Sequence, residues 1–158
     1  MVMPMSDPCY VSKKFGKLIL LILTALFIIG TFILFTQRKS AVRINGATYS
    51  IEVADSPEKQ YKGLSNRPSI CSDCGMLFVF KDRSPRTFVM REMEFPLDIV
   101  WIDGVRVVGA AKDLPPEGKN YSKRYDSGED VDRVLELNAG TVERDNINIG
   151  DNVVVENL

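Results

Sequence analysis

The chain has 158 residues, 20 basic and 21 acidic side chains, and a net charge of −1. Residues 41–158 keep 15 basic and 20 acidic groups, and this acidic excess argues against a nucleic-acid partner. There is no histidine, which removes the most common general base near neutral pH and the most common metal ligand. We therefore expect neither a bound metal nor a cofactor.

Residues 18–35 form an apolar run of eighteen residues without a charge. A helix of that length covers about 27 Å, close to the hydrocarbon thickness of a bilayer. A secretory signal has a shorter apolar core, roughly 7–15 residues, and ends at a small-residue cleavage site. Here Thr36, Gln37 and Arg38 follow instead. The pattern favours an uncleaved, single-pass transmembrane helix over a signal peptide.

The apolar run divides the chain into four parts. We expect a disordered tail at residues 1–17, the membrane helix at 18–35, a polar linker at 36–40, and one soluble domain at 41–158. Basic residues balance on the two sides of the helix, so charge does not set its orientation. A short tail before a first apolar segment is typical of a signal anchor, which predicts an extracytoplasmic domain. The expected partners are the membrane and an envelope protein or a small-molecule ligand.

The domain begins with the pattern of a β-hairpin. Residues 42–44 and 47–53 are suited to strands, and Asn45 and Gly46 between them favour the positive backbone angles of a two-residue turn. In the second strand, apolar and polar residues alternate, so one face is predicted to be buried.

A short helix and a series of strands follow. Residues 55–58 contain a cap residue and a proline, which predict a helix start, and Gly63 ends that helix. Residues 76–80 are apolar on both faces and predict a central strand. Further strands are predicted at 87–90, 97–103, 105–111, 131–137 and 152–156, a helical turn at 140–145, a charged turn at 81–86, and a long loop at 113–130.

This order of elements predicts an α+β domain. It is β-rich, with a curled or barrel-like mixed sheet and two short helices. We assign Trp101 and the phenylalanines to its core.

An ordered set of motifs runs through the same region, and the chain resembles the family called domain of unknown function 192 over about residues 51–155. The motifs are Gly63-Leu64 with Arg67, GMLFVF at 75–80, Phe88 and Met90, PLDIVWID at 96–103, VLELNAG at 134–140, and the turn at 149–151. The resemblance implies a compact, mostly β domain, often behind a secretion signal or an anchor, and it implies no activity. After Phe88 that family usually has tryptophan, methionine, a basic residue, asparagine and threonine. Here residues 89–93 read VMREM, which puts any ligand contact of that turn in doubt.

Cys71 and Cys74 have the spacing of a CxxC motif. In thioredoxin-like enzymes a helix after the motif lowers the thiol pKa, whereas here a glycine and a strand follow. A zinc site needs two more ligands, which carboxylates or another chain would have to supply. A structural disulfide or free thiols, a redox pair and a metal clip are the alternatives, in decreasing order of weight.

Asp98 lies on a strand that is apolar on both faces, so its carboxyl group needs a partner or a proton. The alternatives are a structural role, through an ion pair with Arg91 or bonds to backbone amides, and a role in binding a ligand. Glu136 repeats this pattern between two leucines. If Arg91, Asp98 and Glu136 converge, they form a small polar pocket suited to a cationic or hydroxylated ligand.

The sequence thus favours a membrane-anchored, extracytoplasmic domain with a binding or accessory role. The alternative is an enzyme, acting either in thiol-disulfide exchange through Cys71 and Cys74 or as a carboxylate-based hydrolase. A third possibility is a cytoplasmic scaffold whose cysteines stay reduced.

Overall fold

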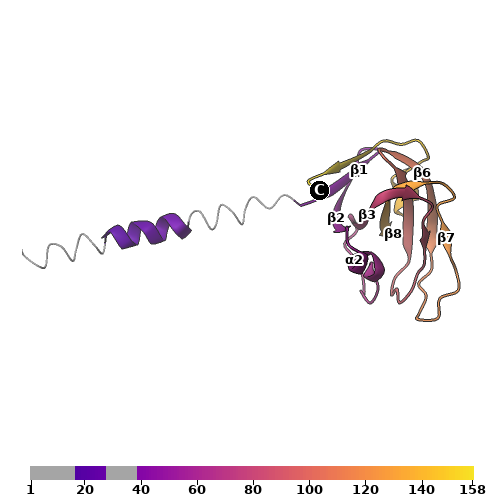
Figure 1. Cartoon of the computed structure of the whole chain (residues 1–158), viewed down its shortest axis with the longest axis horizontal. Helices are drawn as coiled ribbons and strands as arrows, with labels where there is room; N and C mark the ends of the chain where they lie inside the picture. The colour runs from indigo at the N-terminus through magenta and orange to yellow at the C-terminus, as the bar shows by residue number, and fades with distance from the viewer. Residues whose placement is uncertain (1–16, 28–38) are drawn as a thin grey trace, which may run out of the picture. The chain divides into compact units, whose positions relative to one another are not determined.

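A computed structural model describes residues 17–27 and 39–158 of the chain (Figure 1). Residues 17–27 are helical. The rest of the predicted membrane segment, most of the predicted tail and part of the linker lie outside the described residues. Among the residues that are described, no helix combines the length and apolarity needed to cross a bilayer. Lys39–Leu158 forms a separate compact unit, which contains the elements below.

The predicted hairpin is confirmed. It joins β1 (Ala41–Ile44) to β2 (Ala47–Ala54), which pair antiparallel. The turn residues Asn45 and Gly46 have φ angles of 51° and 85°, the region that this residue pair adopts readily. Local turn chemistry therefore determines how the sheet begins.

The predicted short helix is α2 (Pro57–Lys62). The Ser56 hydroxyl accepts a hydrogen bond from the Lys59 backbone N–H at 3.4 Å, and the proline occupies the first turn. Gly63 ends the helix with a φ of 49°, where a side chain would be strained. None of the α2 residues is buried, so the helix lies on the surface of the domain.

Within residues 39–158, seven strands form one mixed sheet in the order β6-β5-β8-β3-β2-β1-β9. Only β2 and β3 in that sheet run parallel; the other neighbours are antiparallel. The predicted β-rich domain is confirmed. The remaining strands of the sheet are β3 (Cys74–Ser84), β5 (Leu97–Asp103), β6 (Arg106–Leu114), β8 (Val131–Asn138) and β9 (Val153–Glu156).

Two predictions along the chain were wrong in extent. The charged turn predicted at 81–86 is largely strand, because β3 continues to Ser84. The strand predicted at 87–90 is reduced to β4 (Thr87–Phe88), which pairs with β7 (Tyr125–Asp126) inside the predicted long loop. The Thr87 and Asp126 side chains, 39 residues apart, are hydrogen-bonded. Such a long-range pairing leaves no local sequence pattern, which explains the difference.

The sheet curls into a half-barrel. An isolated bridge joins Arg106, at the start of β6, to Asn152, just before β9, and the Val153 N–H donates to the Val105 carbonyl at 2.9 Å. Figure 1 shows the strands wrapping around a common interior. The short helix α3 (Thr141–Arg144) follows β8. The predicted curled sheet is therefore confirmed.

The curled sheet separates two hydrophobic clusters. Alternate side chains of a strand point to opposite faces, so Leu77 of β3 packs in the interior cluster with Leu135 and Val100. Phe78 packs in the outer cluster, together with Met90 and Met93 from the chain between β4 and β5. The outer face of the sheet is thus covered by loops and by the separate two-stranded sheet of β4 and β7.

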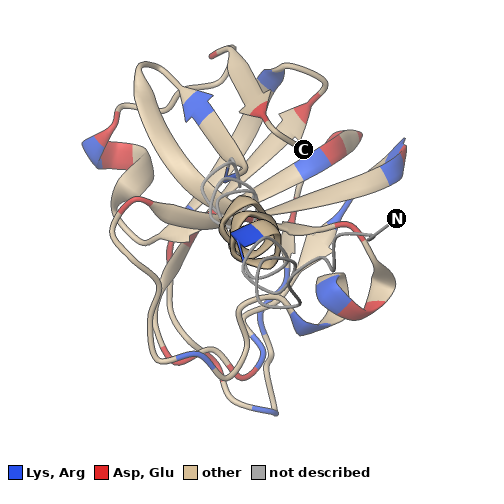
Figure 2. Ribbon diagram, turned by 90° about the vertical axis from the view of Figure 1, so that its left-hand side faces the viewer, with Lys and Arg blue, Asp and Glu red and all other residues tan. Residues whose placement is uncertain are grey.

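Charged residues of both signs are interspersed on this domain (Figure 2). In the view of Figure 2, basic and acidic positions alternate along α2, the loops and several strand ends. One region of the outer face differs from this mixed pattern, because the side chains that line a cavity there are mainly basic.

Candidate functional site

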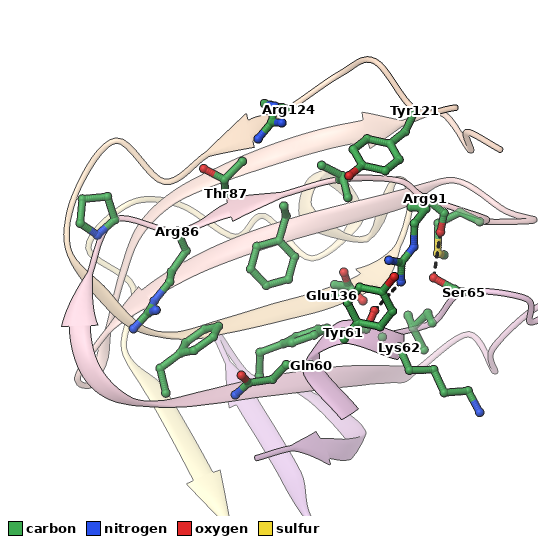
Figure 3. A pocket seen from close by; sticks show the side chains of 18 residues that line it. Gln60, Tyr61, Lys62, Ser65, Arg86, Thr87, Arg91, Tyr121, Arg124 and Glu136 are labelled. Atoms are coloured by element: carbon green, nitrogen blue, oxygen red, sulfur yellow. Dashed lines mark hydrogen bonds between the residues drawn. The ribbon is translucent and has the colours of Figure 1, made fainter. Parts of the chain in front are cut away.

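A cavity of about 510 Å³ lies against the outer face of the sheet, and we call it the outer cavity (Figure 3). The outer side of β3 and β8, helix α2 with the residues after it, and the segment from β4 onward form its walls. A volume of this size is typical of small-molecule sites. The residues that matter most for its chemistry are Tyr61, Phe78, Arg86, Phe88, Arg91 and Glu136.

Aromatic rings form one wall of the outer cavity. Strand alternation places Phe78 and Phe80 on the outer side of β3, and Phe88 of β4 packs edge-on against Phe78 with ring centroids 4.8 Å apart. Phe88 also contacts Trp101 edge-on, at 5.6 Å, and Trp101 is the only tryptophan of the chain. Ligand contact with Phe88 is therefore expected to alter Trp101 fluorescence.

Arg91 occupies one end of the cavity. Its Nη2 donates to the Tyr61 carbonyl at 2.6 Å, and its guanidinium lies 3.9 Å from the centre of the Tyr61 ring. The backbone around Arg91 is also held: Ser65 Oγ donates to the Arg91 carbonyl at 2.8 Å, and the Glu92 N–H donates to the Gly118 carbonyl. The buried Nε of Arg91 has no hydrogen-bond partner. The arginine is thus fixed in place with donor capacity to spare.

Arg86 marks the other end in the view of Figure 3. Its Nη2 lies 3.0 Å from the Asp82 carboxylate and donates to the Asp82 carbonyl at 2.8 Å, and its guanidinium lies 4.0 Å from the Phe80 ring centre. The Arg86 side chain holds the pKa of Asp82 below its ordinary value, with help from Ser84. Arg86 Nε, like that of Arg91, is buried without a partner.

Glu136 is the acidic residue of the cavity wall. It lies on β8 opposite Met76 of β3 and Ile99 of β5, and only 6% of the residue is exposed. Its buried Oε2 has no hydrogen-bond partner. Burial raises the pKa of this carboxyl from 4.5 to about 8, although the positive charge of Arg67 acts in the opposite direction. Glu136 is therefore uncharged at neutral pH.

Basic residues predominate on the wall of the outer cavity. Lys62, Arg86, Arg91 and Arg124 line it, and Glu136 is the one acidic side chain among the lining residues. Two of the four cations have an acidic neighbour, because Arg86 pairs with Asp82 at 3.0 Å and Arg91 Nε lies 3.9 Å from Glu92 Oε2. This lining favours an anion over the cationic ligand that the sequence suggested. An anion meets attraction, and its apolar part can contact the phenylalanine wall.

Asp98 does not line this cavity. Its carboxyl oxygens accept hydrogen bonds from the backbone N–H groups of Asp113 and Val142, both at 2.8 Å, and the residue is fully buried. Val142 lies in the first turn of α3, whose cap residue offers no side-chain hydrogen bond, so Asp98 satisfies a donor there. Arg91 and Glu136 share a cavity, whereas Asp98 supports the backbone of the half-barrel.

Cys71 and Cys74 form a disulfide just before β3. Both cysteines line a second cavity of about 390 Å³, with the ion pair of Arg67 and Glu52 on its wall. Arg67 holds the pKa of Glu52 below its ordinary value. Among the described residues, no cluster of three or more cysteine, aspartate or glutamate side chains is placed to hold a metal ion.

Sequence reasoning missed most of the cavity wall. The assignment of Trp101 and the phenylalanines to the core is confirmed for Phe78 and Trp101, which are buried, although Phe78 also lines the cavity. Tyr61 and Arg86 were not singled out. The shared face of Phe78 and Phe80 was readable from the sequence, because they are two residues apart on a strand. The covering by β4 and α2 was not, because it depends on contacts between distant segments.

The chain matches the model of a known protein family. The model of the family DUF192, described as an "Uncharacterized ACR", matches residues 40–155. The chain belongs to the DUF192 family. Residues 89, 92 and 93 depart from the expected family pattern, and of these Val89 and Met93 line the outer cavity, whereas Arg91 keeps the basic residue of the pattern. The departure thus falls on the site itself.

Solved structures agree with this assignment. The DUF192 domain is similar to a crystal structure from Sinorhizobium meliloti 1021, described as a candidate transcription regulator. The two share 32% identity and a TM-score of 0.68, over 75% of this chain and 94% of the other. A protein of unknown function from Novosphingobium aromaticivorans DSM 12444 is similar at 28% identity and a TM-score of 0.67, over 72% and 83% of the two chains. No protein of curated function matches the chain significantly.

Proposed function

We propose that this DUF192 protein is a membrane-anchored, extracytoplasmic binding domain whose outer cavity takes a small organic anion with an apolar body. The observation that carries the proposal is the composition of the cavity, with four basic side chains around a wall of phenylalanine rings. Two of these cations, Arg86 and Arg91, are held by their own contacts, and each has a buried Nε that makes no hydrogen bond. Such preorganised donors bind an anion without first losing side-chain freedom.

The acidic excess of the domain disfavours DNA binding, so the transcription-regulator description of the Sinorhizobium protein is not extended to this chain. A small ligand needs only the local field of the cavity, which is positive. The proposal is therefore compatible with a domain that is acidic as a whole.

A binding assay tests the ligand class. Full-length protein in lipid nanodiscs is titrated calorimetrically with 2-naphthylacetate at pH 7, and the expected Kd is below about 1 mM, or about −4 kcal/mol. 2-Naphthylethylamine has a similar apolar body with a positive charge and is expected not to bind. Inorganic phosphate lacks the apolar body and is expected to bind at least tenfold more weakly. Tight binding of the amine alone would contradict the proposal.

Two arginine variants locate the site. Arg91→Gln removes a charge-assisted hydrogen bond, which is worth about 1.5–3 kcal/mol, and is expected to raise the Kd of 2-naphthylacetate at least tenfold. Arg83→Gln is the matched control, because Arg83 pairs with Asp103 and does not line the outer cavity. Equal effects of the two substitutions would show that the anion binds elsewhere.

The membrane placement rests on the apolar run at residues 18–35 and on the disulfide. The run is suited to a bilayer in length and composition, and disulfides persist mainly outside the reducing cytoplasm. Full-length protein is expected in the membrane fraction, and a variant without residues 18–35 in the supernatant. Recovery of the uncut full-length chain in the supernatant without detergent would contradict the anchor.

Thiol-disulfide exchange remains the second candidate, because the disulfide lines a cavity. Cys74 is followed by β3 rather than by a helix, so no helix terminus lowers a thiol pKa. A Cys71→Ser and Cys74→Ser double variant is expected to bind 2-naphthylacetate with unchanged Kd. Catalysis of insulin reduction by the wild-type protein, lost in the double variant, would favour the redox role instead.

A further inference from the structure

We propose that Glu136 is a specificity-determining residue which, in its uncharged form, donates a hydrogen bond to the anionic group of the ligand while Arg91 pairs with that group. Binding in the outer cavity then requires one proton on the protein. The inference rests on the binding role proposed above and identifies the ligand as an organic acid bound in its ionised form.

Buried polar groups without a hydrogen-bond partner are concentrated on the wall of the outer cavity. Among the described residues, five buried side-chain polar atoms lack a hydrogen-bond partner, and three of them belong to Arg86, Arg91 and Glu136. Buried polar groups in folded proteins are almost always paired, so their concentration in one cavity indicates groups that await a ligand or solvent. Glu136 is the most buried of the three residues, at 6% exposure.

Arg91 and Glu136 are connected through the end of α2. The Arg91 guanidinium donates to the carbonyl of Tyr61, and a Cβ atom added to Gly63, two residues on, would lie 4.0 Å from Glu136 Oε2. In the view of Figure 3, Glu136 lies nearer to Arg91 than to Arg86. In the proposed complex one anionic group faces both Arg91 and Glu136, while its apolar body extends along the phenylalanine wall.

The surroundings of Glu136 keep its carboxyl uncharged at neutral pH. The strands on either side place Met76 and Ile99 opposite it, and neither residue carries a charge. On the α2 side the charged neighbours are Arg67, which is bound to the Glu52 carboxylate through two hydrogen bonds, and Lys62 at the cavity wall. The segment after β4 contributes Arg91, which is bound to the Tyr61 carbonyl and lies 3.9 Å from the Glu92 carboxylate. Desolvation outweighs the positive charge of Arg67 and raises the pKa of Glu136 to about 8.

Ionisation of Glu136 is expected to weaken the binding of an anionic ligand. A neutral carboxyl can donate to a ligand carboxylate, whereas an ionised one has only acceptor oxygens and repels it. Above pH 8 the ligand must therefore compete with the negative charge of Glu136 for Arg91. Organic acids such as 2-naphthylacetate are fully ionised from pH 6 upward, so the ligand itself adds no pH dependence in that range.

Calorimetric titrations with 2-naphthylacetate between pH 6.5 and 9.5 test the inference on the full-length protein. The wild-type Kd is expected to stay constant up to about pH 7.5 and then to rise, approaching tenfold per pH unit above pH 8. At pH 8.5, titrations in buffers of different ionisation enthalpy are expected to show proton uptake on binding. A constant Kd from pH 7 to 9.5 would overturn the inference.

Two variants distinguish the effect of ionisation at residue 136 from the effect of losing its hydrogen-bond donor. Glu136→Gln keeps a donor but cannot ionise, so its Kd is expected to be close to the wild-type value at pH 7 and flat up to pH 9.5. Glu136→Leu has no donor and is expected to bind at least fivefold more weakly than Glu136→Gln throughout. If Glu136→Gln weakens at high pH as the wild type does, another group carries the proton and the inference fails.

The two proposals fail in different ways. Absence of binding by 2-naphthylacetate at pH 7 in wild type and Glu136→Gln alike contradicts the proposed function. Binding that depends on Arg91 but not on pH leaves the proposed function standing and contradicts only the role of Glu136.

Discussion

Two buried carboxyl groups on neighbouring strands have opposite surroundings. Asp98 of β5 faces the interior of the half-barrel, where two backbone N–H groups bond to its oxygens at 2.8 Å. Glu136 of β8 faces the outer cavity, and its buried Oε2 has no partner. Burial is nearly equal, so burial alone does not distinguish a structural acid from a functional one. The number of satisfied hydrogen bonds does.

The difference follows from the backbone donors that each carboxyl group has or lacks. Asp98 supplies acceptors to the first turn of α3 and to Asp113, whose φ of 51° lies in a region that is unfavourable for most residues. These donors have no other acceptor in a buried site. Glu136 supplies nothing comparable to the protein, so its desolvation is a cost in stability. Three substitutions test this difference between Asp98 and Glu136.

The largest effect is expected for Asp98→Ala. It leaves the buried N–H of Val142 and the partly buried N–H of Asp113 without their acceptor, at a cost of about 1–3 kcal/mol for the buried group and less for the other, so we expect a loss of about 3 kcal/mol. Thermal unfolding followed by Trp101 fluorescence should show a fall in Tm of roughly 10 °C. Asp103→Ala, at the partly exposed end of the same strand, is the control and should cost less than about 1 kcal/mol. A loss at Asp98 no larger than this would refute its structural role.

Glu136→Gln is expected to act in the other direction near pH 8, as a stabilising change. Because the folded pKa of about 8 lies above the ordinary value of 4.5, the unfolded chain loses this proton first as pH rises. The contribution of Glu136 to wild-type stability is therefore most favourable below pH 4.5 and declines by about 1.4 kcal/mol per pH unit up to pH 8.

The variant cannot ionise and escapes this decline. Its buried amide costs about 2 kcal/mol, so we expect the variant to be less stable than wild type by about 2 kcal/mol at pH 4.5 and more stable by about 2 kcal/mol at pH 8. Thermal unfolding across this range measures the difference. A stability gap that does not grow between pH 5 and pH 8 would show that Glu136 is ionised in the folded protein.

Local patterns predicted the elements of the fold well. The Asn45-Gly46 turn, the cap and proline at the start of α2, and the glycine that ends it each act within a few residues. The β-rich class and the curled sheet followed from the number of short strands. What failed was β4 with β7, whose pairing depends on residues far apart in the chain.

The candidate site was harder to predict, because it depends on strand register. Alternation showed correctly that Asp98 shares a face with Val100 and that Glu136 faces away from Leu135. Only the pairing of β5 with β8 shows that these are opposite faces of one sheet, since Asp98 lies across from Leu137 and Glu136 across from Ile99. One strand read alone cannot show which of its faces is the interior.

The smallest expected effect concerns Arg67, which tests how the surroundings of Glu136 set its proton affinity. Arg67 lowers the pKa of Glu136, although desolvation outweighs it. Arg67→Gln is therefore expected to raise that pKa by a few tenths, which an NMR titration of the Glu136 side-chain carboxyl carbon can resolve. Stability should change by only about 0.5 kcal/mol, because the pair with Glu52 is partly exposed.

Arg43→Gln provides the matched control for this measurement. It also breaks one partly exposed ion pair, with Glu156 at 3.2 Å, but it lies on β1 and does not line the outer cavity. The Glu136 titration should be unchanged in this variant. If both variants shift it equally, the general charge of the domain sets the proton affinity of Glu136. If neither does, desolvation acts alone, and the contrast with Asp98 lies wholly in the absence of hydrogen-bond partners.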